Sequence, residues 1–214
     1  MRQSLFGMTE WVTRFAYVNI LWLAFTLLGL VLFGFFPATI AMNAMIRQWL
    51  LGNTDEPVFK FFWTTYKQEF IKGNLLGLTL VLIALLFYVD LQFIQMNQGG
   101  VFDIIQIPIY LFMLAITLTA FYVIPTYVHF NLSIWGIWKN SFLVMLIHPF
   151  HNIGMVLGAF VILYIQYIIP GTFFFFGGSM IAFVIMGTCL QAFQKVEKKQ
   201  KAQREENGTD NLEK

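Results

Sequence analysis

Three histidines are the residues whose type and spacing come nearest to metal or acid–base chemistry. His148 and His151 lie in the motif HPFH, and His129 lies upstream of it. Neutral imidazoles bind zinc. However, Pro149 disturbs the helical spacing that would point both rings of the motif the same way, and there is no Asp or Glu from Ile104 to Gln194 to complete a site. We therefore expect histidines at a membrane interface, with no bound metal and no cofactor.

Other catalytic patterns do not occur in the sequence. It contains no HExxH motif, no pair of intramembrane aspartates, no Ser–His pairing in a credible context and no GxxxxGK[ST] phosphate loop. The lone Cys189 can form neither an internal disulfide nor a cysteine-pair metal site. We therefore predict that the protein is not an enzyme.

Two polar residues inside apolar stretches are candidates for a functional role. Asp90 lies near the end of a long apolar run, and ionisable groups in such runs are often functional. However, we expect Asp90 near the outer membrane surface, within reach of water, and this argues against a functional role. The amide of Asn19 can bond between helices or hold a ligand, and we expect the structural role.

The elements that position these residues must lie in a membrane. The chain is 58% hydrophobic and only 11% charged, whereas soluble domains carry about 25% charged residues. No Asp, Glu, Lys or Arg occurs from Asn140 to Gln194. We predict an integral membrane protein.

The apolar runs predict an all-α, polytopic helix bundle with about five spans. A transmembrane helix needs roughly 20 apolar residues, and the Pro170-Gly171 turn divides the last run. Residues 1–193 then form a single transmembrane domain, followed by a charged tail at 194–214. The expected spans lie near residues 15–36, 73–93, 105–129, 152–169 and 172–193.

The distribution of Lys and Arg predicts the orientation of the spans, because basic flanking segments stay in the cytoplasm. With the C-terminus inside, the inner segments are 37–72, 130–151 and 194–214, which hold eleven of the thirteen basic residues. Arg2 and Arg14 stay outside. We therefore predict that the N-terminus is outside and the C-terminus inside. The net charge of +2 is too small to suggest a nucleic-acid partner.

The segment after the first span predicts a short helix along the cytoplasmic surface. Pro37 suits the first turn of a helix. Beyond it Thr39, Asn43 and Arg47 recur every four residues and form a narrow polar stripe on an otherwise apolar helix.

A second short helix is expected after Pro57, with an aromatic face and a basic face. The aromatic residues are Phe59, Trp63, Tyr66 and Phe70, and the basic residues are Lys60 and Lys67. Such a helix lies in the membrane interface. Two interpretations stay open: a membrane anchor alone, or a candidate docking face for a partner made of these six residues.

Several ordered motifs resemble the YesL-like family of bacterial multi-pass membrane proteins, whose domain has no assigned function. They lie within residues 15–93: NILWL from Asn19, GFFPATIA from Gly34, RQWLLG from Arg47, FFWTTYKQEFIKGNLLG from Phe61 and YVDL from Tyr88. The resemblance implies a place in the bacterial cytoplasmic membrane. It also implies genes beside carbohydrate-uptake ABC transporters, and hence an accessory role in sugar uptake.

Two functions from different classes are therefore expected. The first is an accessory of carbohydrate uptake with a cytoplasmic docking surface. Its partners would be the lipid bilayer and either ABC-transporter permease subunits or further copies of the chain. The alternative is a small autonomous transporter or channel for a small solute, which needs polar side chains along a path through the spans.

Overall fold

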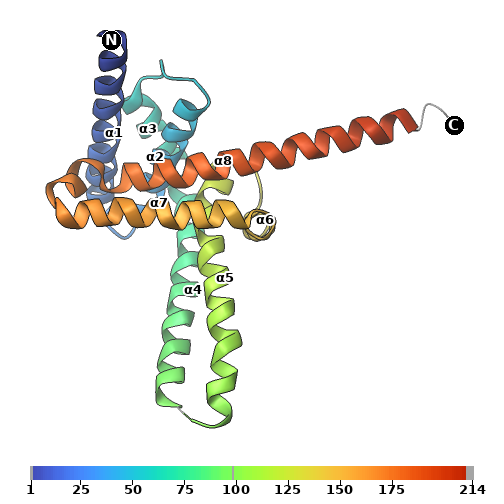
Figure 1. Ribbon diagram of the computed structural model, residues 1–214. Helices are drawn as coiled ribbons and strands as arrows, with labels where there is room; N and C mark the ends of the chain where they lie inside the picture. The colour runs from blue at the N-terminus through green and yellow to red at the C-terminus, as the bar shows by residue number, and fades with distance from the viewer. Residues whose placement is uncertain (1, 98, 211–214) are drawn as a thin grey trace.

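The computed structural model describes residues 2–97 and 99–210, which form eight α-helices and no strand (Figure 1). The helices are α1 (Arg2–Leu28), α2 (Phe35–Leu50), α3 (Val58–Gln68), α4 (Phe70–Met96), α5 (Val101–His129), α6 (Ile134–Ile147), α7 (Pro149–Ile168) and α8 (Gly171–Asp210).

Five helices are long and apolar enough to cross a membrane, which confirms the all-helical class and the five predicted apolar helices. They contain the segments Thr9–Leu28, Phe70–Met96, Ile104–His129, Pro149–Ile168 and Gly171–Lys198. The two short helices expected after the first span are α2 and α3.

The first apolar helix ends earlier than the expected boundary at residue 36. α1 stops at Leu28, and a tight turn leads into α2 at Phe35. In this turn Leu30 and Val31 have positive φ angles of 57° and 66°. The turn also brings two glycines together: a β-carbon on Gly29 would lie 2.3 Å from Cα of Gly34. The apolar run hides this turn because its bulky residues give no sign of left-handed backbone.

The last helix is longer than expected. α8 continues from the predicted span at 172–193 through the segment predicted as a charged tail, to Asp210. Lys, Glu and Gln make up most of this segment and are strong helix formers. Residues 211–214 of the predicted tail lie outside the described residues.

The elements are arranged as two hairpins that run across each other (Figure 1). α4 and α5 form one hairpin, which projects away from the rest of the molecule. α7 and α8 form the other and run across the inner end of the first. α1 extends from the opposite side of the α7–α8 hairpin, and the end of α8 extends beyond the other helices.

The best-packed region lies where α1, α2, α3 and α8 meet. Val18, Met45, Ile46, Phe62 and Met186 have no exposed surface there. By contrast, few residues of α4 and α5 are buried: 11% and 17%, respectively, of an 18-residue apolar stretch in each helix. The protein itself therefore leaves most of the α4–α5 hairpin uncovered.

Candidate functional site

The predicted docking face of α3 is divided between the core and the surface. Phe25 of α1 lies 5.0–5.3 Å from the ring centroids of Phe62, Trp63 and Tyr66. Tyr66 is buried, and its hydroxyl donates to the carbonyl oxygen of Phe25 at 3.2 Å. Burial raises the pKa of Tyr66, so the hydroxyl keeps its proton. Tyr66 and Phe62 thus fix α3 to the core.

The exposed part of this face is the α3 surface patch, which we define as Phe59, Lys60, Trp63 and Lys67. Phe59 is 53% and Trp63 40% exposed. The Nζ atom of Lys67 lies 4.7 Å from the centroid of the Trp63 ring, in cation–π contact. Phe70, the fourth predicted aromatic, is half-buried at the start of α4 and lies edge-on to Tyr66.

The amide of Asn19 bonds to α8. Its Nδ2 donates to the carbonyl oxygen of Phe174 at 2.7 Å, and its Oδ1 accepts from the backbone N–H groups of Gly178 and Ser179 at 2.9 and 3.0 Å. The side chain is completely buried. These bonds join α1 to α8, so the amide holds two helices together.

Asp90 lies apart from the other candidate residues. It is on α4, toward the end of the helix that lies at the far tip of the α4–α5 hairpin, and its side chain is partly exposed. The structure does not bring it together with Asn19 or with the α3 surface patch.

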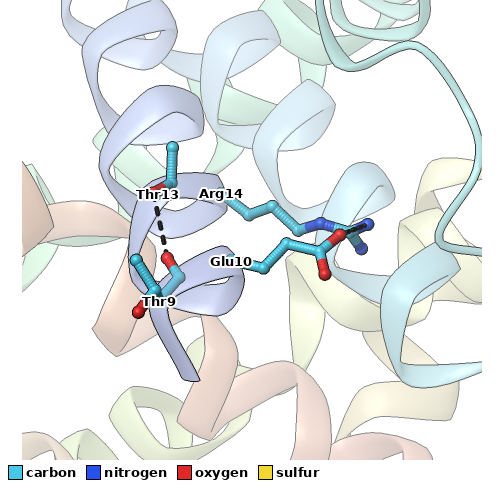
Figure 2. Close-up of polar contacts among 4 residues, drawn as sticks. All are labelled: Thr9, Glu10, Thr13 and Arg14. Atoms are coloured by element: carbon cyan, nitrogen blue, oxygen red, sulfur yellow. Dashed lines mark hydrogen bonds and ion pairs between the residues drawn. The ribbon is translucent and has the colours of Figure 1, made fainter. Parts of the chain in front are cut away.

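A charge pair occupies the N-terminal half of α1 (Figure 2). Arg14 Nη2 lies 2.5 Å from Glu10 Oε1, and Thr13 Oγ1 donates to the carbonyl oxygen of Thr9 at 2.9 Å. Arg14, expected on the outer side, is thus paired within its own helix. The other expected outer residue, Arg2, has its side chain outside the described part of the structure. The orientation of the chain stays a prediction.

A polar cluster that the sequence analysis missed joins α2, α5 and α8. Arg47 Nε donates to His129 Nδ1 at 3.1 Å, and His129 Nε2 lies 3.1 Å from Glu197 Oε1. With Nδ1 as the acceptor from Arg47, Nε2 is the ring nitrogen that faces Glu197 as a donor. The His129 side chain is 11% exposed and stacks on Phe193.

A polar pocket of about 300 Å³ lies beside this cluster. Glu69, Lys72, Tyr127, His129 and Asn131 are among its lining residues. The Tyr127 hydroxyl donates to Glu69 Oε2, which ties α5 to the junction of α3 and α4. Charges of both signs thus gather where the polar stripe of α2 ends.

The two histidines of the HPFH motif make different contacts, His148 within its own segment and His151 with α8. His148 Nδ1 lies 3.1 Å from the carbonyl oxygen of Val144, and His151 Nε2 lies 3.4 Å from Lys195 Nζ. Within the described residues no three His, Cys, Asp or Glu side chains form a group suited to a metal ion.

The contacts of His129 could not be predicted from the sequence because its partners lie far away along the chain. Arg47 precedes His129 by 82 positions and Glu197 follows it by 68. The one available signal was that Arg47 ends a polar stripe on an apolar helix and needs a partner. In the same way, Phe62 was missed because the aromatic pattern placed the α3 face at Phe59, Trp63 and Tyr66.

Comparison with known proteins gives matches along most of the chain. A family model described as "Protein of unknown function, DUF624" matches residues 15–91. The uncharacterized protein YteU of Bacillus subtilis (strain 168) is 37% identical over 188 residues, which cover 88% of this chain and 84% of YteU. The uncharacterized proteins YesV and YesL of the same organism are 35% and 34% identical over 194 residues, 91% of this chain and 93% and 91% of theirs. No solved structure matches the chain. The predicted resemblance to YesL-like proteins is confirmed.

Proposed function

The chain belongs to the DUF624 family of proteins of unknown function, and from that premise we propose that it is an accessory of a carbohydrate uptake system. It would sit in the bacterial cytoplasmic membrane and bind a membrane partner, such as an ABC-transporter permease, through the α3 surface patch. The carbohydrate part rests on the gene neighbourhood that the family resemblance implies, and the docking part rests on the patch.

The observation that carries the docking proposal is a pair of exposed aromatic side chains on a firmly held helix. Phe59 and Trp63 are on the surface, while Phe62 and Tyr66 of the same helix are buried against Phe25. Tryptophan and tyrosine anchors contribute most of the binding energy at many interfaces. A helix that is already fixed loses little conformational entropy when a partner binds.

The orientation belongs to the proposal. With the C-terminus inside, α3 and its two lysines lie on the cytoplasmic side, as the positive-inside rule expects. Lys60 and Lys67 would then face either anionic headgroups or an acidic surface of the partner.

The polar side chains of the apolar helices support this accessory role over an autonomous transporter. Asn19 bonds to α8, Thr119 Oγ1 donates to the carbonyl oxygen of Ala115, and Thr79 Oγ1 accepts from Trp138 Nε1. These groups are used within the protein, which leaves few to solvate a polar solute along a path through the helices.

The test is recovery of partners from the native membrane. Cells are grown on polysaccharide, the tagged full chain is purified in mild detergent, and associated proteins are identified by mass spectrometry. We expect permease or solute-binding subunits with the wild type, and their loss with the double variant Phe59→Ala and Trp63→Ala. The matched control changes two exposed aromatics of α7, Phe150→Ala and Tyr167→Ala, and should keep the partners.

Unchanged recovery and unchanged sugar uptake with the α3 double variant would reject the docking role. Recovery of this chain alone from the wild type, in detergent that keeps known transporters intact, would favour the autonomous transporter. Flux of a labelled sugar into liposomes that contain only this protein would then be the next measurement.

A further inference from the structure

An apolar groove lies between α4, α5 and α6, away from the α3 surface patch. It encloses about 560 Å³. Leu82 and Ile83 of α4, Ile116 of α5, and Trp135, Trp138 and Lys139 of α6 are among its lining residues. The α6 end of the groove therefore carries a cation and tryptophans, and the α4–α5 end is aliphatic apart from Thr79 and Thr119.

The α6 end of the groove is held in place by specific contacts. Trp138 Nε1 donates to Thr79 Oγ1 of α4 at 3.0 Å, and Ile137 is buried between the helices. Ser133 caps α6 by accepting from the N–H of Gly136 at 3.3 Å. The position of α6 over the hairpin is thus fixed.

The groove mouth combines the groups found at the headgroup level of a bilayer. Trp135 is 79% exposed, and the exposed Lys139 has no hydrogen bond or ion pair among the described residues. Tryptophan and lysine side chains place an apolar part toward the lipid tails and a polar tip at the interface. A groove that offers both an aliphatic lining and an unpaired positive charge can bind an amphiphilic anion.

We propose that this groove binds one glycerophospholipid with an anionic headgroup. An acyl chain lies along Leu82, Ile83 and Ile116, and the phosphate pairs with the ammonium group of Lys139. A polar solute would leave the aliphatic lining without a matching surface, and in a zwitterionic lipid such as phosphatidylcholine the positive charge of the headgroup offsets the phosphate and weakens its pairing with Lys139. The site is independent of the docking role proposed for α3.

The test measures lipid retained by the purified full chain. The protein is reconstituted in vesicles of equimolar phosphatidylglycerol and phosphatidylcholine, extracted in mild detergent and examined by native mass spectrometry. We expect one phosphatidylglycerol per wild-type chain. Lys139→Gln should lower the preference for phosphatidylglycerol roughly fivefold, the effect of one basic residue at a membrane surface.

Two further variants separate the site from general effects of charge and folding. Lys198→Gln removes an exposed lysine of α8, outside the groove, and should leave the preference unchanged. Ile83→Trp fills the aliphatic end and should reduce retention of both lipids while helix content, measured by circular dichroism, stays the same.

Several outcomes would overturn the proposal. One is that the Lys139→Gln variant prefers phosphatidylglycerol as strongly as the wild type does. Another is that the wild type retains both lipids equally. Release of the lipid by inorganic phosphate alone would identify a free-anion site instead. A protein dimer that carries no lipid would identify a second copy of the chain as the occupant.

Discussion

At the residue scale, several buried polar side chains bond across helices, whereas Thr26 Oγ1, Trp49 Nε1 and Gln166 Oε1 have no hydrogen-bond partner in the described part of the structure. Asn19 bonds to the backbone of α8, Ser141 donates to Thr126, and Tyr122 donates to Asn152. Each pair joins two different helices. In apolar surroundings an unpaired polar group is costly, so each such bond helps to specify which helices meet.

His129 gives a residue-scale prediction, because its two ring nitrogens contact Arg47 and Glu197. We expect His129→Leu and Arg47→Met each to lower the free energy of unfolding by about 1–3 kcal/mol, the range for a lost hydrogen bond to a charged group. The loss in the double variant should be smaller than the sum of the single losses, with a coupling of roughly 0.5–3 kcal/mol. Denaturant unfolding in detergent micelles measures all three.

The control pair combines Arg47→Met with His148→Leu, because His148 bonds to the backbone of its own segment. These two losses should add to within about 0.5 kcal/mol. Additivity of the Arg47 and His129 losses would contradict the contact.

At the scale of elements, the turn between α1 and α2 depends on close contact of two backbone segments. A β-carbon on Gly29 would lie 2.3 Å from Cα of Gly34 and 2.4 Å from its nitrogen, and backbone atoms cannot move aside as a flexible side chain can. We expect Gly29→Ala to lower the free energy of unfolding by about 1–3 kcal/mol, the cost of an overpacked site. The midpoint of thermal unfolding in detergent is the measurement.

Gly154 supplies the matched control, because a β-carbon there meets nothing within 4 Å. It lies in α7, where alanine is the better helix former by about 1 kcal/mol, so Gly154→Ala should be neutral or stabilising. Equal stability of the two variants would show that the turn does not bring α1 and α2 so close.

The same elements show what could be predicted from the sequence. Hydrophobic runs of about 20 residues revealed five apolar helices, because length and polarity decide membrane insertion. They did not reveal the end of α1, because Leu30 and Val31 adopt left-handed backbone that glycine normally supplies. Helical periodicity found the aromatic side of α3 but placed its centre one residue away from Phe62, the fully buried member.

At the scale of the whole molecule, the long helices do not all run in one direction. The α4–α5 and α7–α8 hairpins run across each other, and α1 and the tip of the α4–α5 hairpin point to opposite ends (Figure 1). Helices that run across each other cannot all lie parallel to the bilayer normal. The predicted orientation puts the start of α1 and the hairpin tip on the same, outer side, so labelling must decide it.

The α4–α5 hairpin gives the sharpest form of that experiment, because most of its apolar surface is uncovered by protein. If it crosses the bilayer with its tip outside, a cysteine at Phe102, which is exposed at the start of α5, will react with an impermeant maleimide in intact cells. A cysteine at Asp55, exposed in the loop before α3, will react only after the cells are opened. The native Cys189 is buried and adds little background.

The two positions together decide between whole-molecule arrangements. Labelling of Phe102→Cys but not of Asp55→Cys in intact cells puts α3 and its surface patch inside, where a cytoplasmic partner can reach them. Labelling of Asp55→Cys in intact cells contradicts the predicted orientation and the proposed cytoplasmic docking together. Protection of both positions would place the hairpin tip inside with α3, so that α4 and α5 would lie along one face of the membrane without crossing it.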